Sequence, residues 1–451
     1  MTIHQTRDVF TPTRPARIAF VERDAVNDKL VNAMTTPGKQ VVVYGHSGSG
    51  KTTLLVNKLN QLYEGHITTR CMKGIKFEQL ILDAFDQLAP YYTSERSKAK
   101  KNTSMVDLTG SYLAIQSKIN SSRTVENSQK EVRILPPQLT PQALGKFIGQ
   151  ANQCWVLEDF HKVDDGERTK LSQLMKVFMD LSDEYPNLKI IALGAVDTAR
   201  QVVDYDPEMR YRVSEVHVDL MTPKEIEAII EKGEQALKVI FPSEIKALIA
   251  RYSTGLASVC HHICLNMCDV AGISQTASEP IQMSKAHFES SIKVYVEEAS
   301  DSIRSAFDKA LRQRRKTIYD NAALILRALS SLKERGASRV DIHTRISQTV
   351  PKYPGTSLKN YLPKLTTQEY GGIVRYDSNS GLYSFSDPIY RAFALAHFRD
   401  HEKPHRNVEG DVNQLLSLLT KELMHHFPKG IGKSVRVVVR TSSEDQSDSH
   451  S

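Results

Sequence analysis

The sequence predicts an α/β fold with a mainly parallel sheet in its first half, followed by an all-α lid and a C-terminal winged-helix domain. The first observation is the β-branched run 40–44, which leads through a glycine-rich loop directly into a helical pattern. The second is that apolar strands at 154–157, 188–194 and 213–218 alternate with helical segments, an order typical of doubly wound parallel sheets. The third is a group of three short helices and a hairpin between residues 321 and 385, which is the size of a winged helix.

The loop after the first strand matches G-x-x-x-x-G-K-T, the pattern of a phosphate-binding loop, and predicts a P-loop NTPase core. Its glycines let backbone N–H groups turn toward a triphosphate, and the positive end of the following helix points to the same place. Lys51 is expected to contact the β- and γ-phosphates, and the Thr52 hydroxyl to bind Mg²⁺. The expected ATP-binding residues are Gly45, His46, Ser47, Gly48, Ser49, Gly50, Lys51, Thr52 and Thr53.

A second strand supplies the carboxylates that an ATPase needs. The apolar run 154–157 ends in Glu158 and Asp159. We expect Glu158 to bind Mg²⁺ or its water shell, and Asp159 to orient or deprotonate the attacking water. The commoner order places Asp first, so the assignment of the two roles stays open. At the end of the next strand, Asp197 and Thr198 are weaker candidates for sensing the γ-phosphate, because an Asp helix cap explains them as well.

The whole chain divides into five expected parts. Residues 1–18 form an extended N-terminal arm, and the ATPase core, 19–222, holds a polar, basic insertion at about 91–135. The lid, 223–316, begins at a Thr-Pro-x-Glu helix start and is expected to contain only helices. The winged helix covers 317–400. The tail, 401–451, carries one apolar helix, a β-like segment at 434–440 and a polar end, and the β-like segment has three expected partners: the insertion, the winged-helix hairpin or a partner's sheet.

Composition and cysteine spacing exclude several classes of protein. No apolar run approaches the ~20 residues of a membrane span, and the N-terminus lacks a signal-peptide core. Five cysteines without a paired pattern indicate a reducing, cytoplasmic location. Cys260, Cys264 and Cys268 cannot all bind one metal ion, because the first and last lie ~12 Å apart along one helix. We therefore expect these three side chains to line the buried face of that helix.

With these parts placed, residues 19–400 resemble AAA+ ATPases of the initiator and STAND branches. Phe20-Val21-Glu22-Arg23-Asp24 resembles the element that precedes the phosphate loop and lies near the adenine, which implies that Val21 and Arg23 contact ATP. The motif around Glu158 and Asp159 resembles the acidic strand of that branch. The chain departs from the family in the lid, where Gly255-Leu256-Ala257 lacks the STAND proline. Ser258 and Val259 stand where initiators often carry an arginine, with only His261 and His262 nearby.

Several arginines and lysines have expected roles outside the phosphate loop. Arg212, or less favourably Arg210, is a candidate arginine finger for a neighbouring subunit, with local salt bridges as the alternative. A finger that acts on a neighbouring subunit implies that the chain forms a homo-oligomer. In the winged helix, Lys359, Lys364 and Arg375 are candidates for contact with DNA phosphates, although the expected recognition helix has few groups that read base edges. A protein-binding winged helix is an equal alternative, and the net charge of +7 only mildly favours acidic partners.

These observations lead to the hypothesis of an ATP-driven molecular switch with ATP and Mg²⁺ as cofactors. The resemblance implies a slow regulatory ATPase that signals to a separately encoded effector protein, with bacterial anti-phage defence as one setting. The alternative is a DNA-binding ATPase of initiator or transposition-regulator type. A metabolic phosphotransferase is disfavoured, because a winged helix has no evident use in such an enzyme.

Overall fold

A computed structural model describes most of the chain from Thr2 to Arg399. The described ranges are 2–63, 65–88, 140–195, 209, 211–312 and 318–399. Several expected features lie outside these residues, so their predictions stay open. They are the insertion at 91–135, Asp197, Thr198, Arg210 and the tail at 401–451.

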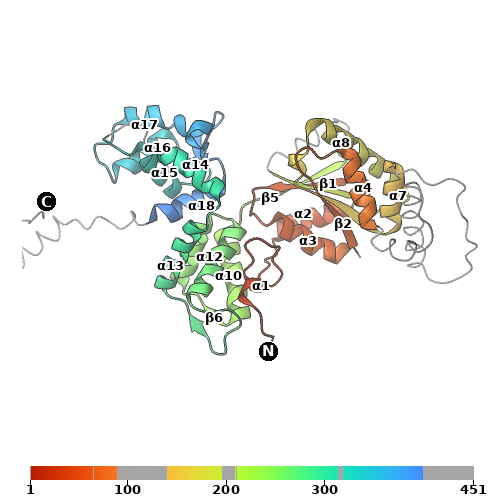
Figure 1. The fold of residues 1–451 in the computed structure, drawn as a ribbon, viewed down its shortest axis with the longest axis horizontal. Coiled ribbons are helices and arrows are strands. Elements are labelled where there is room, and N and C mark those ends of the chain that lie inside the picture. The colour runs from red at the N-terminus through yellow and green to blue at the C-terminus, as the bar shows by residue number, and fades with distance from the viewer. Residues whose placement is uncertain are drawn as a thin grey trace, which may run out of the picture. The chain divides into compact units, whose positions relative to one another are not determined.

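The first half of the chain forms a five-stranded parallel sheet, which confirms the predicted α/β fold (Figure 1). The strand order is β2-β3-β4-β1-β5, so the strand before the phosphate loop lies between β4 and β5. The strand that carries the acidic pair, β3, is separated from it by β4. The strands are β1 (Gln40–Gly45), β2 (Gly65–Arg70), β3 (Gln153–Glu158), β4 (Ile190–Gly194) and β5 (Val213–Val218).

Helices cover both faces of the sheet, because alternate strand residues point to opposite sides. On one face, Val41, Val43 and Val156 pack against α2 and α3. On the other face, Val42 and Trp155 pack against α4, α7 and α8. The helices are α2 (Asp24–Thr35), α3 (Lys51–Leu62), α4 (Phe77–Leu88), α7 (Pro141–Gln150) and α8 (Asp165–Asp180), with the short turns η1 (Phe160–Lys162) and η2 (Leu181–Asp183).

The lid consists mainly of four helices: α10 (Pro223–Leu237), α11 (Ser243–Ser253), α12 (Ala257–Val270) and α13 (Lys285–Glu297). Its first helix has the predicted capping box, in which Thr222 accepts from the Glu225 backbone and Glu225 accepts from the Thr222 backbone. The expectation of helices alone is wrong in one detail, since β6 (Val239–Ile240) and β7 (Ile281–Gln282) form a two-residue parallel pair. This pair closes the loops between lid helices with backbone hydrogen bonds.

The three cysteines of α12 are buried, as predicted. Cys260, Cys264 and Cys268 each have no exposed surface and belong to the apolar core of the lid. Burial raises the pKa of the Cys268 thiol to about 12, and the pKa of Cys264 is raised for the same reason. These thiols therefore stay protonated at neutral pH. Among the described residues, no group of three or more His, Cys, Asp or Glu side chains is placed to hold a metal ion.

The N-terminal arm is not simply extended, and that expectation is wrong for α1 (Thr6–Val9). Phe10, which follows this helix, is completely buried in the lid core, where its ring lies 6.5 Å from that of Phe241. A side chain at Gly233 would collide with the Phe10 ring, because an added Cβ would come within 2.2 Å of it. The arm also pairs with the lid backbone through Thr6 N–H and Ser274 C=O. The arm is thus folded onto the lid before it reaches the sheet.

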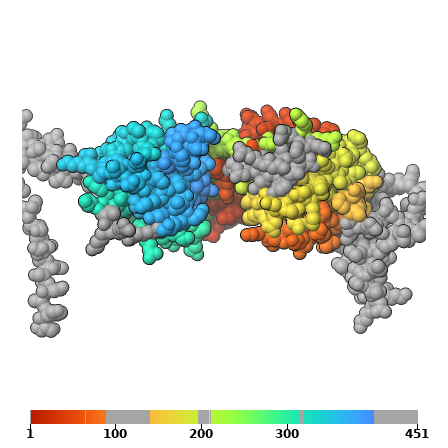
Figure 2. Space-filling model, turned by 90° about the horizontal axis from the view of Figure 1, so that it is seen from above, coloured from red at the N-terminus to blue at the C-terminus, as the bar shows by residue number. Residues whose placement is uncertain are grey.

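The winged-helix region has its own apolar core, formed by α15, α16, α17, the β8–β9 hairpin and part of α18. In Figure 2 the residues of this region, coloured cyan to blue, lie together in one mass. Helix α14 (Asp301–Leu311) contributes Ala306 and Phe307 to this core. The remaining elements are α15 (Asn321–Ser331), α16 (Arg339–Ser347), α17 (Gly355–Tyr361), η4 (Lys364–Thr366), η5 (Gln368–Tyr370), β8 (Val374–Asp377), β9 (Leu382–Phe385) and α18 (Pro388–His397).

Helix α18 joins the winged-helix core to the lid. Its residues Ala392 and Leu395 pack in the lid core, whereas Phe393 packs in the winged-helix core. Thr254 of the lid also donates a hydrogen bond of 3.2 Å to the Pro388 carbonyl. None of the described helices is long and apolar enough to cross a membrane.

Candidate nucleotide-binding site

The phosphate loop and the acidic strand end line one cavity of about 940 Å³. Because β1 and β3 run parallel, the loop after the first and the carboxylates after the second emerge at the same edge of the sheet. All of the predicted nucleotide-binding residues except His46 line this cavity, and so do Glu158 and Asp159. The structure therefore brings together the two halves of the predicted site.

The glycines of the loop occupy positions that side chains would disturb. Gly48 has a φ of +77°, and Gly50, which precedes α3, has a φ of +91°. An added Cβ at Gly45 would lie 2.4 Å from the Val218 carbonyl oxygen, so β5 passes directly beside the loop. At Gly48 an added Cβ would lie 2.2 Å from the Ser258 hydroxyl. These close approaches explain why the loop needs glycine at both positions.

Lys51 makes hydrogen bonds within its own loop. Its Nζ donates to the carbonyl oxygens of Gly45, at 3.0 Å, and His46, at 2.7 Å. Burial lowers the pKa of Lys51 to about 8, although the nearby Asp159 carboxylate acts in the opposite direction. A triphosphate would place negatively charged oxygens beside this buried ammonium group, which otherwise donates to neutral carbonyl oxygens.

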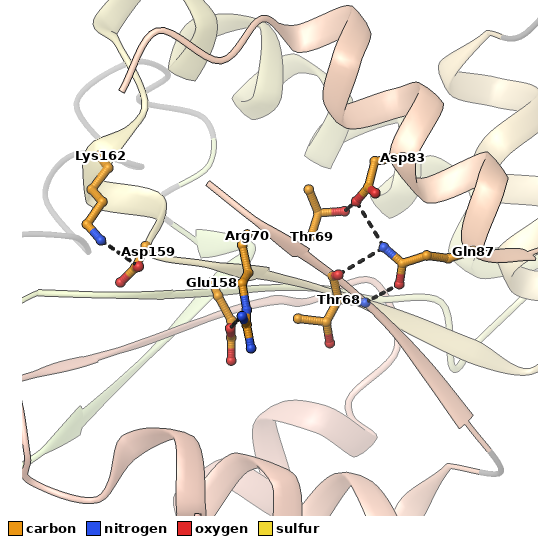
Figure 3. Close-up of polar contacts among 8 residues, drawn as sticks. All are labelled: Thr68, Thr69, Arg70, Asp83, Gln87, Glu158, Asp159 and Lys162. Carbon is orange, nitrogen blue, oxygen red and sulfur yellow. Dashed lines mark hydrogen bonds and ion pairs between the residues drawn. The ribbon is translucent and has the colours of Figure 1, made fainter. Parts of the chain in front are cut away.

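The two carboxylates at the end of β3 are both paired with cations (Figure 3). Glu158 accepts from Nε of Arg70 at 3.2 Å, and Asp159 accepts from Lys162 Nζ at 2.7 Å. Asp159 also has a left-handed backbone, with a φ of +57°, which is uncommon outside glycine. Such strain is typical of sites where function fixes the direction of a side chain.

A network of side chains holds the end of β2 that carries Arg70. Among the described residues β2 is an edge strand, so the backbone of Thr68 has no neighbouring strand of the described sheet on one side. The side-chain amide of Gln87 takes that place, accepting from Thr68 N–H and donating to Thr68 C=O, both at 2.9 Å (Figure 3). Next to it, Asp83 accepts a hydrogen bond of 2.6 Å from Thr69. The strand end is thereby fixed beside Glu158.

The lid reaches the cavity through the first turn of α12. Ser258 N–H donates to the Gly48 carbonyl at 3.2 Å, so the lid touches the phosphate loop directly. Of the four lid residues singled out from the sequence, Ser258 and His261 line the cavity, while Val259 and His262 do not. His262 instead pairs with Glu298 at 2.8 Å.

Val21 and Arg23, which the resemblance implies as ATP contacts, line the cavity. Arg23, however, points to the lid: it pairs with Glu225 at 2.9 Å and donates to the Asp219 carbonyl at 2.9 Å. It therefore connects the segment before α2 with the first lid helix. Sequence reasoning missed the arm residues 11–16, which also line the cavity, because this segment has no periodic pattern.

Arg212 does not join the site of its own chain. It directly precedes β5. The first residue of β5, Val213, pairs with Gln40 at the start of β1. Arg212 therefore lies at the amino ends of these strands, opposite the phosphate loop. Its guanidinium is 3.4 Å from Asp180, and both side chains are mostly exposed. The winged-helix lysines Lys359 and Lys364 and Arg375 do not line the cavity either.

The residues around the cavity fit a magnesium ion bound together with phosphates. Thr52 supplies a hydroxyl oxygen, and Glu158 and Asp159 supply carboxylate oxygens. Mg²⁺ prefers such hard oxygen ligands, and it is usually held by one or two carboxylates plus the phosphates of the substrate. Ser49, which also lines the cavity, has a buried hydroxyl that no other described residue pairs with.

No protein-family model and no curated protein matches this sequence. Among solved structures, the Walker-type ATPase PABY2304 of Pyrococcus abyssi is 15% identical with a TM-score of 0.46, and the match covers 86% of this chain and 99% of that one. The ORC2 protein of Aeropyrum pernix is 13% identical with a TM-score of 0.43, covering 88% and 97%. The RuvB Holliday junction branch migration motor of Thermotoga maritima is 12% identical with a TM-score of 0.39, covering 84% and 97%.

The chain is similar to these three solved structures over most of its length. At these identities the likeness concerns the fold alone.

Proposed function

We propose that this chain binds ATP with Mg²⁺ and hydrolyses it to ADP and phosphate. The observation that carries the proposal is the shared cavity, in which a phosphate-binding loop with Lys51 faces the carboxylates of Glu158 and Asp159. Backbone N–H groups of the loop hold the phosphates, and Lys51 neutralises the β- and γ-oxygens. Mg²⁺, when bound, adds further charge neutralisation at the same oxygens.

Hydrolysis needs a water molecule aligned with the γ-phosphorus atom. Asp159 accepts the proton of this water as it attacks, and the bond to the ADP oxygen breaks. Glu158 contributes a magnesium ligand or orients the water shell. The reverse assignment of these two carboxylates is the alternative, because both line the cavity and each has one cationic partner.

We further propose that nucleotide binding acts as a switch between the core, 19–222, and the lid, 223–316. Ser258 contacts the phosphate loop, and Arg23 connects the core to Glu225 of the lid. Any nucleotide that moves the loop acts on the first of these contacts directly. The winged helix, 317–400, follows the lid through α18, which shares apolar packing with both.

The signal passes to a partner effector protein in this proposal, and the active form is a homo-oligomer. Arg212 is the candidate finger in this proposal, because its side chain is mostly exposed and lies away from the cavity of its own chain. A mixture of Arg212→Ala and Asp159→Asn proteins should then recover part of the turnover that each has lost. Absence of recovery in a protein shown to be oligomeric would contradict the role of Arg212 as an arginine finger.

The second candidate function is an ATPase of initiator or transposition-regulator type that binds DNA. Exposed cations on the winged helix favour it, among them Lys359 near the end of α17 and Arg375 on β8. Turnover measured with and without duplex DNA at two salt concentrations separates the candidates. Stimulation by DNA that weakens with salt supports the DNA-binding ATPase, and turnover indifferent to DNA supports the effector switch.

A further inference from the structure

Two buried polar side chains meet at the wall of the cavity, although they lie 250 residues apart in the sequence. Thr11 comes from the N-terminal arm and His261 from α12. Both line the cavity, with 8% and 3% of their surface exposed. The backbone N–H of Thr11 donates to Nδ1 of His261 at 3.1 Å. Since Nδ1 accepts this bond, the proton of a neutral imidazole sits on Nε2.

The imidazole of His261 is neutral under ordinary conditions. Burial alone lowers its pKa to about 4. By contrast, the charge of Lys51 contributes to the lowered pKa values of His46 and His161. His261 therefore lies away from the charges of the phosphate end, and its Nε2 acts only as a hydrogen-bond donor.

Both side chains have unused hydrogen-bonding capacity. The Thr11 hydroxyl is buried, and no described residue is its hydrogen-bond partner. Nε2 of His261 has no partner among the residues that the structure describes. Leaving a buried polar group such as the Thr11 hydroxyl unpaired typically costs ~1–3 kcal/mol, so a ligand that pairs with this hydroxyl gains affinity.

The surroundings of these two groups suit a flat apolar ring with a polar edge. Ala19, Val21 and Ile229 line the same cavity and belong to the apolar core of the lid. On α12, His261 lies one turn beyond Ser258, which contacts the phosphate loop at Gly48. One turn advances ~5 Å along a helix, so His261 lines the cavity one turn further along α12 than the residue that contacts the phosphate loop.

We propose that Thr11 and His261 form the base-recognition subsite of the cavity, with Nε2 of His261 donating a hydrogen bond to a ring nitrogen of adenine. The Thr11 hydroxyl pairs with the neighbouring polar group of the base edge. This assignment rests on the proposed ATP-binding function and names two residues that determine which base is accepted.

Atom-substituted nucleotides test the proposal on the full-length protein. Calorimetry compares ATP with three analogues in which a C–H group replaces N1, N3 or N7. The wild-type protein should bind one of the three at least about fivefold more weakly than ATP, because that analogue leaves the His261 donor unpaired. His261→Phe, which keeps an aromatic ring, should bind ATP and that analogue equally.

The neighbouring histidine provides a matched control. His262→Phe changes the next residue of the same helix, which pairs with Glu298 and does not line the cavity. It should keep the wild-type preference. Thr11→Val provides a second variant, since it removes the hydroxyl but keeps the backbone N–H that fixes the His261 tautomer. It should bind ATP about two- to tenfold more weakly while still distinguishing the analogue.

The outcomes separate this proposal from the function on which it rests. If the wild-type protein binds ATP and all three analogues equally, His261 does not read the base, whereas ATP binding stands. If His261→Phe keeps the preference of the wild type, another residue reads the base and the proposal is overturned. If no nucleotide binds at all, ATP binding and base recognition both fail. Should His261→Phe not fold, equal binding of ATP and all three analogues by the wild-type protein, or unchanged ATP affinity in Thr11→Val, would still overturn the proposal.

Discussion

The two ends of the cavity differ in how their polar groups are paired. At the phosphate end the charged groups are paired, Lys51 with carbonyls of its own loop, Glu158 with Arg70 and Asp159 with Lys162. Two neutral atoms there, the Ser49 hydroxyl and His161 Nδ1, have no hydrogen-bond partner among the described residues. At the other end, the Thr11 hydroxyl and Nε2 of His261 have no partner among the described residues.

This difference indicates what nucleotide binding changes at each end. Phosphates and Mg²⁺ must replace existing contacts, so binding rearranges the phosphate end. A base forms hydrogen bonds with groups that are already oriented, so the other end is preorganised. Conformational change is therefore expected at the phosphate loop and the acidic strand end, where the lid residue Ser258 also makes its contact.

The largest effect is expected from the acidic pair. Asp159→Asn should lower turnover by ~100- to 10,000-fold, the range typical of a lost general base, while ATP affinity stays within about threefold. Asparagine is suited to the left-handed backbone of this position, so the variant should fold. Steady-state turnover and calorimetry check both statements. Glu158→Gln serves as the matched variant, and loss of turnover there with loss of Mg²⁺ binding in Asp159→Asn would reverse the two roles.

Removing the loop cation should have the next largest effect. Lys51→Ala deletes the ammonium group expected at the β- and γ-phosphates, and charged hydrogen bonds of this kind contribute ~1.5–3 kcal/mol. ATP affinity should fall at least about tenfold, and turnover should be abolished. Lys58, on the same helix, pairs with Glu22 at 3.1 Å and does not line the cavity, so Lys58→Ala is the control. Unchanged ATP binding and turnover in Lys51→Ala would show that the phosphate loop is not part of the ATP site.

The sequence predicts the phosphate end well, because each part of it is local. The loop lies within nine consecutive residues, and Glu158 and Asp159 directly follow an apolar strand. The other end depends on contacts between distant segments, such as Thr11 with His261 and Phe10 with Gly233. A single buried aromatic residue in an aperiodic arm gives no sequence signal, so the arm was expected to be extended.

Helix α18 illustrates the same limit. Sequence reasoning placed the end of the winged helix at residue 400 but assigned no helix after the hairpin, yet Pro388–His397 forms a helix with Asp387 as N-cap. The Asp-Pro start is a readable signal that reasoning passed over. That this helix packs in two apolar cores at once, through Leu395 and Phe393, depends on tertiary structure alone.

The pH dependence of ATP binding should come from the phosphate end, through Lys51. Burial lowers the pKa of Lys51 from 10.5 to about 8, so the free protein loses this proton as pH rises through 8. Bound phosphates favour the charged form, so ATP affinity should fall above pH 8, by at most about tenfold per pH unit. Calorimetry near pH 8 in buffers of different ionisation enthalpy should detect proton uptake on binding. In Lys51→Ala this uptake should disappear, and its persistence would assign the proton to another group.

The smallest expected effect concerns the cations that hold the two carboxylates. Exposed ion pairs contribute ~0–1 kcal/mol, so releasing a carboxylate changes a rate or an affinity by at most about fivefold. Lys162→Ala frees Asp159 and should raise turnover at saturating ATP within that range, because the free carboxylate accepts the proton of water more readily. Arg70→Ala frees Glu158 and should instead lower the Mg²⁺ concentration needed for half-maximal turnover, with little change in the maximal rate. The two variants are matched, since each removes one cation from the same strand end (Figure 3). An exchange of the two results would mean that Glu158 is the base and Asp159 the magnesium ligand.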